Sequence, residues 1–565
     1  MKLKYILFAS LAVSGWMIGS TSCSDSFLNE KMYSSYGTDV TDINSKVLGL
    51  HYKVGEILGF SGQQGYWGMW QDGTDVGAPG DIQGVEQPFY RYAELTSENA
   101  GVNDLWSKLY DIINAANQII QSDSNNPSAS AGVAEAKFFR AWSYNQLVTG
   151  WGKVPLIQES ASSPQTDYTR NSIEEVDGLI ESDLIYAIEN LPEVDALVKE
   201  SRISKDAARL LAGEAYLRMG MRDSKFFAEA EKVLTPIITD GKYQLIKERY
   251  GKFLGETGDY YHDMFRWGNQ RRSQGNKEGI WTFEMEYGNT VTGGTIGAPQ
   301  HRRNWVPAFH KLDGMVNADS IGGRGNGRLR LSNYVKYGVF KEKGDIRNSN
   351  YNIRRVMWYN KPGWSATIGI DQNGYQVEPG TGVKDVTVKT GDRVVPHISD
   401  TLNVFYTHTT KWGGYDPTDD FGWALTKDFP MMRYAEVFLL RAEARFRQGN
   451  KKGAAEDINV LRDRAFKDYR QVNPDAGKVT EDMIDIDFIL DERIRELVGE
   501  ENRRFTLMRT GELTNRVNMM VSHWNELEES KQTSGYNPEV HTLLPIPLTE
   551  IQLNKDANLE QNPGY

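Results

Sequence analysis

The sequence predicts a mostly α-helical protein in which paired helices support a loop-rich region. Three observations predict this fold class. Apolar residues recur with the helical period in the N-terminal and C-terminal parts of the chain. Alanine-rich stripes follow one another across short breaks. Between these parts, residues 260–425 hold 23 glycines and 7 of the 13 tryptophans that lie beyond residue 22.

The first 22 residues have the features of a signal peptide. Lys2 and Lys4 precede an apolar run over residues 5–18, and small residues then lead to Cys23, the single cysteine. The run is shorter than the ~20 apolar residues of a membrane span. We therefore expect a lipoprotein signal over residues 1–22, with cleavage before Cys23 and lipidation of its thiol. A plain secretory signal with an incidental cysteine is the alternative.

The composition excludes several classes of protein. One cysteine in 565 residues excludes a disulfide scaffold and a cysteine-rich zinc site. With 64 Lys and Arg against 76 Asp and Glu the net charge is −12, and removal of residues 1–22, which hold two lysines and no acid, makes it −14. This balance argues against nucleic-acid binding. An anionic body of this kind would be held to a membrane by acyl chains, not by attraction to anionic lipids.

Five helices are predicted in the N-terminal part. In residues 105–121 the apolar side chains recur at intervals that place them on one helical face. A Ser-, Asn- and Pro-rich break leads to a second helix over 134–149, which gives a helix pair. The other three helices are predicted at 172–190, 205–219 and 226–240.

Two further helices are predicted near the C-terminus, over 435–446 and 454–465, with Gly449-Asn450 between them. Alanine-rich stripes joined by a short turn allow close antiparallel packing, as in tetratricopeptide hairpins. The copies are far apart, so we expect such pairs within a single unit over 23–565 and not a continuous solenoid. Its parts are an N-terminal helical part (23–259), a loop-rich insertion (260–425) and a C-terminal helical part (426–565).

One strand is predicted in the loop-rich insertion. Trp281, Phe283, Met285 and Tyr287 alternate with polar residues at period two. The glycine-rich stretches 322–327 and 363–382 are expected to be loops, as is the segment 60–87 in the N-terminal part. Loops that a rigid scaffold supports are where binding residues concentrate.

Several separate stretches, in order along the chain, resemble a single known family. They include CSDSFLNE (23–30), LWSKLYDIINAANQII (105–120), the triplet Asp345-Ile346-Arg347, RYAEVFLLRAEA (433–444), DERIRELVGEENRRFTLMRTGEL (491–513) and LPIPLTEIQLNKDANLEQNPGY (544–565). Together they span essentially the whole mature chain. They resemble the SusD/RagB outer-membrane lipoproteins of Bacteroidetes-type bacteria.

This resemblance implies a mostly helical, SusD-like fold in which four tetratricopeptide-like units support an irregular ligand-binding face with a few short strands. Members of the family are lipid-anchored on the cell surface, as lids over a SusC-like TonB-dependent transporter. They capture glycans, or in some branches peptides, for import, and they have no catalytic turnover. We therefore expect a binding protein with no enzymatic activity, no cofactor and no metal.

A helical secreted hydrolase is the alternative from another class. Glu492 and Glu496 lie one turn apart on a predicted charged helix over 491–509. The arginines of that helix, however, predict ion pairs, which lower a carboxyl pKa and make a poor general acid. The eight histidines show no metal-ligand spacing. The acidic patches 72–75 and 416–420 are expected to be solvated loops and not calcium sites.

The aromatic residues carry the ligand hypothesis. A sugar ring presents an apolar face that stacks on Trp or Tyr, and its hydroxyls need polar partners beside that ring. Trp106, Trp142 and Trp151 lie in stretches that resemble the helical scaffold of the family, 105–120 and 134–157, and Trp281 heads the predicted strand. All four are assigned to the core. The predicted ligand-binding residues are Trp67, Trp70, Asp72, Asp75, Tyr92, Tyr287, Trp305 and Trp364. A peptide-binding member of the same family, with fewer stacked rings, is the other alternative.

Overall fold

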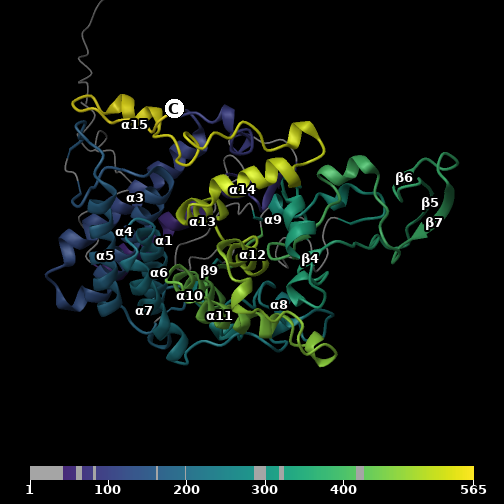
Figure 1. Ribbon diagram of the computed structural model, residues 1–565, viewed down its shortest axis with the longest axis horizontal. Coiled ribbons are helices and arrows are strands. Elements are labelled where there is room, and N and C mark those ends of the chain that lie inside the picture. Colours follow the sequence, from purple (N-terminus) through teal and green to yellow (C-terminus); the bar gives the residue numbers. More distant parts are fainter. Residues whose placement is uncertain are drawn as a thin grey trace, which may run out of the picture. The chain divides into compact units, whose positions relative to one another are not determined.

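Six helices in the first part of the chain pack on their neighbours in sequence. In the computed structural model, α3 packs on α4, α4 on α5, α5 on α6 and α6 on α7, while α1 lies against α3 and α4 (Figure 1). Their bounds are Ile43–Leu58 (α1), Ala100–Asp123 (α3), Ser130–Trp151 (α4), Ile173–Asn190 (α5), Lys205–Gly220 (α6) and Lys225–Thr239 (α7). The five helices predicted in this part are confirmed, and their ends lie within a few residues of the expected positions.

The structure describes residues 42–58, 66–80, 84, 86–160, 163–197, 199–285, 301–316, 323–414 and 425–565. Residues 43–565 form one compact unit. Cys23 and the predicted signal peptide lie outside the described residues. Within the described part of the chain, no helix combines the length and apolar character that crossing a membrane requires.

Local sequence explains where these helices begin and how closely they pack. Ser172 caps α5 in a reciprocal box: the Glu175 backbone N–H donates to its hydroxyl, and the Ser172 N–H donates to the Glu175 carboxylate. Gly213 lies in the middle of α6, where a Cβ would stand 2.6 Å from the Leu234 side chain of α7. A glycine is therefore needed for the close approach of these two helices.

The C-terminal helices join this group through α10, which packs on α7, α11 and α12. The turn predicted at Gly449-Asn450 is confirmed, since Gly449 has φ of 82° and the Asn450 side chain caps α11. The helices are Tyr434–Arg447 (α10), Lys451–Ala465 (α11), Ile486–Leu497 (α12), Arg503–Thr510 (α13), Leu513–Met519 (α14) and Leu548–Leu553 (α15).

The charged segment 491–509 is not the single helix that was predicted. It divides between α12 and α13, because Gly499 adopts a positive φ of 82° and Asn502 accepts a hydrogen bond from the Phe505 N–H as the cap of α13. The prediction of ion pairs in this segment is confirmed. Glu492 pairs with Arg495 one turn on, and Arg493, Arg503 and Arg509 bind carboxylates of other elements.

The Asp345–Arg347 triplet completes a buried network of ion pairs with α12. Arg347 binds Asp345 through two hydrogen bonds of 2.8 and 2.9 Å and donates to Glu492 (2.8 Å) and Glu496 (3.2 Å). Burial alone would raise the pKa of both glutamates, but the surrounding guanidinium groups hold each pKa well below its usual range. The two carboxylates are therefore structural anions, as the sequence predicted.

Among the described residues, short antiparallel strands form four small sheets, β1–β3, β2–β9, β4–β8 and β6–β5–β7. In Figure 1 the three strands of the last sheet lie apart from the helices. The strands are Gly77–Pro79 (β1), Gly279–Phe283 (β2), Leu329–Leu331 (β3), Ile353–Arg354 (β4), Ser365–Ile370 (β5), Gln376–Val377 (β6), Lys384–Lys389 (β7), His408–Thr409 (β8) and Phe429–Arg433 (β9). The described chain also has the short helices Trp67–Gln71 (α2), Tyr260–Asp263 (α8) and His301–Trp305 (α9).

One sequence expectation about these strands is wrong, and a second, the strand itself, is confirmed with a different pattern of burial. The stretch 363–382 is not all loop, because β5 and β6 form a hairpin across the turn at Asp371–Gly374. The strand predicted at 281–287 is present as β2, but all five of its residues are buried, so it has no polar solvent face. The strand β9 pairs along one edge of it, α6 packs against it, and Phe138 and Phe139 of α4 contact the Trp281 ring.

Candidate functional site

The described part of the predicted binding loop includes α2, in which the ring of Trp70 turns inward. Trp70 is buried and stacks on Tyr66, with ring centroids 5.9 Å apart. The backbone then continues into β1, which pairs with β3 of the loop-rich insertion. The side chain of Trp67 lies outside the described residues. The expectation of an exposed ring is therefore wrong for Trp70.

The two carboxylates of this loop are also buried. Asp75 accepts hydrogen bonds of 2.8 and 2.7 Å from Arg503 of α13, and neither side chain is exposed. Burial opposes ionisation, but Arg503 and Arg516 lower the pKa of Asp75. Asp72 has a pKa well above its usual range because of burial and the nearby charge of Glu86. The prediction of a solvated acidic loop is wrong here, and the second acidic patch, 416–420, lies outside the described residues.

Arg504 holds the loop from the next position of α13. Its guanidinium donates to the backbone carbonyls of Met69 (2.8 Å) and Phe89 (3.0 Å) and to the Tyr92 hydroxyl (2.8 Å). Tyr92 in turn donates to the Gly73 carbonyl at 3.0 Å and is only 1% exposed. Tyr92 is therefore part of the support of the loop and not an open stacking surface, contrary to the prediction.

Trp305 and Trp364, the other predicted rings of the insertion, lie in different surroundings. Trp305 ends α9, which contacts α2 and β3, and its side chain is fully buried, so the prediction of an open ring is wrong there as well. Trp364 is half-buried against Tyr359, with ring centroids 4.4 Å apart, in the core beneath β5 and β7. Tyr287 lies outside the described residues.

The described ends of three loop segments nevertheless meet at one place beside α9. Arg302 donates to the Gly414 carbonyl at 3.2 Å, and a Cβ on Gly323 would lie 2.2 Å from the same oxygen. Because α9 also contacts α2, the framework brings the loop of 60–87 and the loops of the insertion to a common edge. Five of the predicted ligand-binding residues are buried beneath or beside this edge: Trp70, Asp72, Asp75, Tyr92 and Trp305.

Two exposed aromatic side chains were not among the predicted ligand-binding residues. Tyr337 is 67% exposed and Trp358 is 45% exposed, and both lie in the loop-rich insertion. Composition placed many aromatic residues in this region, but burial decides which of them a ligand can touch. Burial depends on distant packing that the local sequence does not encode.

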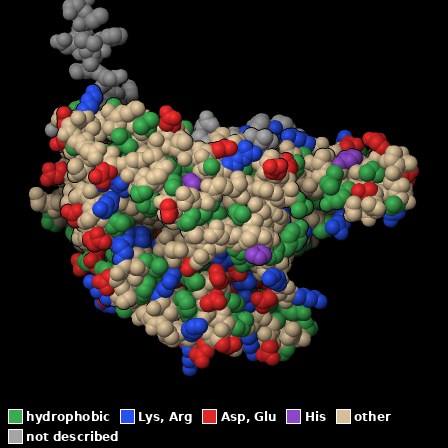
Figure 2. Space-filling view, turned by 45° about the horizontal axis from the view of Figure 1, so that its top comes forward, with side chains coloured by type: hydrophobic (Ala, Val, Ile, Leu, Met, Phe, Trp, Pro, Cys, Tyr) green, Lys and Arg blue, Asp and Glu red, His purple; other side chains and the backbone are tan. Residues whose placement is uncertain are grey.

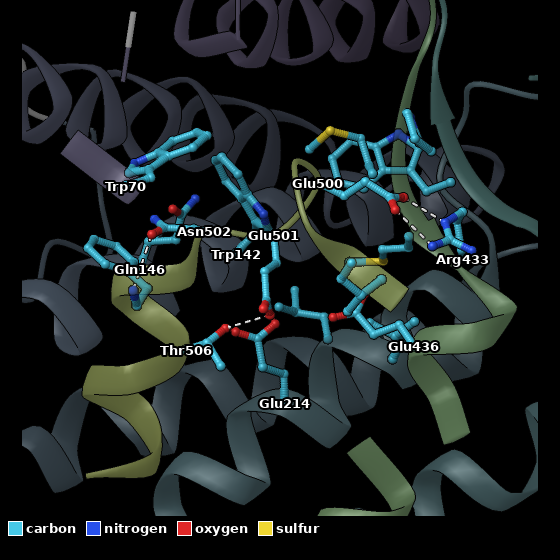
Figure 3. Close-up of a pocket in the computed structure, with 18 of the residues that line it drawn as sticks. Trp70, Trp142, Gln146, Glu214, Arg433, Glu436, Glu500, Glu501, Asn502 and Thr506 are labelled. Atoms are coloured by element: carbon cyan, nitrogen blue, oxygen red, sulfur yellow. Dashed lines mark hydrogen bonds and ion pairs between the residues drawn. The ribbon is translucent and has the colours of Figure 1, made fainter. Parts of the chain in front are cut away.

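A cavity of about 160 Å³ lies between α4, α6, β9 with α10, and the ends of α12 and α13. Figure 3 shows Trp142 and Gln146 of α4 on one side of it, and Glu214 of α6 pointing into it. Trp142 is half-buried and lines this cavity, so its predicted place in the closed core is only partly right.

Two of the glutamates in the cavity wall, Glu436 and Glu501, bind the same arginine. Arg493 Nη2 lies 2.7 Å from Glu501 and 3.0 Å from Glu436, and the Thr506 hydroxyl donates to Glu501 at 3.0 Å. Burial, partly offset by Arg493, raises the pKa of Glu436 to about 7. No group of three or more His, Cys, Asp or Glu among the described residues is arranged to hold a metal ion.

Comparison with known proteins identifies relatives of this chain. The protein-family model described as "Starch-binding associating with outer membrane" matches residues 27–217 of this sequence. SusD-like protein P25 of Formosa agariphila is 25% identical over 544 residues, which cover 91% of this chain and 90% of that protein. Starch-binding protein SusD of Bacteroides thetaiotaomicron is 37% identical over 138 residues, or 24% of this chain and 22% of that protein.

The fold has a solved counterpart of nearly the same extent. The surface glycan-binding protein A from Bacteroides fluxus superposes with a TM-score of 0.65 at 20% identity, covering 93% of this chain and 99% of that one. The mostly α-helical, SusD-like fold that the sequence predicted is thereby confirmed. Finally, the protein-family model described as "SusD family" matches residues 277–565, which are 289 of the 565 residues of this sequence. The chain belongs to the SusD family.

Proposed function

We propose that this protein binds an extracellular oligosaccharide or polysaccharide at the cell surface and delivers it to a SusC-like TonB-dependent transporter. The observation that carries the proposal is the family match over both parts of the chain, residues 27–217 and 277–565. Relatives named for starch binding and for surface glycan binding support a glycan as the ligand.

The proposed ligand face is the edge where α2 and α9 meet and the loops of the insertion begin. Trp67 and Tyr287 are the predicted rings that remain candidates for sugar stacking, and the half-buried Trp364 is a third. The described part of this loop is held in place by Arg503 and Arg504, which bind Asp75, the Met69 carbonyl and Tyr92. A fixed frame lowers the entropy cost of ordering such a surface on binding.

The proposed location follows from the N-terminus. Lipidation of Cys23 would attach the mature chain to the outer membrane, and the acidic body would then face the medium. On the face drawn in Figure 2, acidic and basic side chains are interspersed in small groups. A mixed surface of this kind suits a protein that binds neutral ligands and stays soluble apart from its anchor.

Two experiments test the two parts of this proposal. Electrophoresis of the purified mature chain through gels that contain different polysaccharides should show retardation by at least one of them. If no polysaccharide retards the chain while a peptide mixture binds, the ligand is of the alternative class. A tagged chain solubilised from its native outer membrane should co-purify with a transporter of the SusC type, and its absence would refute delivery without refuting glycan binding.

A further inference from the structure

The cavity between α4, α6, α10 and α13 is large enough for a small organic molecule. Its volume is about 160 Å³. A protein cavity of about 150 Å³ accommodates benzene. Unlike that apolar cavity, this one has carboxylates, an amide and a hydroxyl in its wall, contributed by Glu214, Glu436, Glu501, Gln146 and Thr506. Its lining therefore suits a polar guest that also has an apolar surface.

Basic side chains of the described chain bind all but one of the four carboxylates in the wall. Arg509 is fully engaged by Glu443 through two hydrogen bonds of 2.8 Å. Arg493 binds both Glu501 and Glu436, and Arg503 also binds Glu501 at 3.1 Å. At the other end of the cavity, Arg433 and Lys411 bind Glu500.

Glu214 is the carboxylate that remains. Within the described part of the chain it has no hydrogen bond or ion pair, although it is half-buried and points into the cavity (Figure 3). Its charge contributes to the raised pKa of Glu436 on the facing helix, so the two carboxylates are close enough to repel each other. Arg509 and Arg218 are the nearest positive charges to Glu214 in the described part of the chain, but their hydrogen bonds go to Glu443 and to Asp177 and Asn145. The internal segments outside the described residues contain no Lys, Arg or His.

An aromatic ring lies beside these carboxylates. Trp142 and Gln146 are one turn apart on α4 and both line the cavity, and in Figure 3 the Trp142 ring lies on the side of the cavity opposite Glu214. An indole face attracts a cation through the negative potential above its ring, and this attraction is strongest where water is excluded. Carboxylates on one side and an indole on the other favour an ammonium group.

Buried hydrogen-bond donors give a second and independent indication of a ligand. Trp281 and Arg493 line this cavity and are at most 3% exposed, and the Trp281 Nε1 and Arg493 Nη1 atoms have no acceptor among the described residues. An unpaired buried donor costs about 1–3 kcal/mol. A guest that carries a hydroxyl as well as an ammonium group would satisfy a donor and the carboxylates together.

We propose that this cavity binds a small amino alcohol, whose ammonium group lies between Glu214 and the Trp142 ring. The site is distinct from the proposed glycan face and does not depend on it. Choline is a suitable probe, and its neutral carbon isostere, dimethylbutanol, is the matched control ligand. Calorimetry and tryptophan fluorescence of the mature chain should show saturable binding of choline and at least tenfold weaker binding of dimethylbutanol.

A Glu214→Gln variant should weaken choline binding at least tenfold without changing glycan binding. Glu229→Gln is the control variant, because Glu229 lies on the exposed side of α7 in a pair with Lys232. If Glu214→Gln fails to fold, the unaltered protein still gives a test. Choline affinity should fall between pH 8 and pH 6, because the pKa of Glu436 is about 7 and its protonation removes charge from the wall. Absence of choline binding, or equal binding of dimethylbutanol, would overturn the proposal.

Discussion

Arg503 binds Asp75 through two hydrogen bonds of 2.8 and 2.7 Å, although 428 positions separate the two residues in the sequence. Neither side chain is exposed. The pair attaches the loop of the N-terminal part to α13 of the C-terminal part. A residue that the sequence predicted to touch ligand is therefore a buried anchor of the loop that bears the proposed ligand face.

The first prediction separates these two roles of Asp75. Asp75→Asn removes the closer of the two carboxylates that bind the buried Arg503, and only Glu501, at 3.1 Å, remains. Loss of one partner from a buried ion pair costs about 3–5 kcal/mol. Urea unfolding of the variant should show a loss of this order. Asp475→Asn, which removes an exposed carboxylate paired with Lys478, is the control and should leave stability unchanged. A stable Asp75→Asn protein that no longer bound glycan would instead identify a ligand carboxylate.

The second prediction concerns Trp305. Because its side chain is fully buried, Trp305→Ala should create a cavity and cost about 3–5 kcal/mol of unfolding free energy. Trp305→Phe, which keeps an apolar ring, should cost clearly less. Thermal unfolding of both variants checks the expected order. A normal melting temperature for Trp305→Ala, together with lost glycan binding, would show that the ring is open to ligand.

The third prediction is an acid dependence of stability. His51 and Arg202 bind Glu135 and, against the effect of burial, lower its pKa from 4.5 to about 2. Since the folded pKa is depressed, this contribution is present above pH 4.5 and is lost as the pH falls toward 2. Its size is on the order of 3 kcal/mol. Urea unfolding at a series of pH values should show this loss in the unaltered protein.

Glu135→Gln provides the test of that assignment. The variant should be less stable at pH 7 and should lose less stability than the unaltered protein between pH 4.5 and pH 2. Glu492 and Glu496 will add to the acid dependence of both proteins, since their pKa values are also held low. Identical pH profiles for the two proteins would contradict the role given to Glu135.

The fourth prediction concerns the proposed stacking rings. Trp67→Ala and Tyr287→Ala should each weaken glycan binding roughly fivefold, which corresponds to about 1 kcal/mol for a stacked ring. Tyr52→Ala is the matched control, because Tyr52 is an exposed ring on α1. Calorimetry with the same glycan compares the three variants. Equal affinities in all of them would remove Trp67 and Tyr287 from the ligand face.

Much of the helical fold could be predicted because its signal is local. Three correct predictions depend only on neighbours in sequence. They are the apolar period in 105–121, the helix break at Gly449-Asn450 and the ion pair of Glu492 with Arg495 at i, i+3 spacing. The same reasoning failed at Gly499, where a single positive φ divides a charged segment into two helices.

The site could not be predicted in the same way. Whether Trp305 is buried, and which arginine neutralises Asp75, is decided by contacts between segments hundreds of residues apart. The cavity is a further case, since Trp142 of α4, Glu214 of α6 and Glu436 of α10 meet only in the folded chain. Spacing along one helix carries no information about the side chains that face it from another.

The proposed function requires that the protein binds a glycan without cleaving it. Isothermal calorimetry of the mature chain against a panel of oligosaccharides and polysaccharides tests it most directly, with the same mixtures then assayed for new reducing ends. We predict saturable binding of at least one glycan and no increase in reducing ends. Release of reducing ends, or failure of every glycan in the panel to bind, would contradict the account.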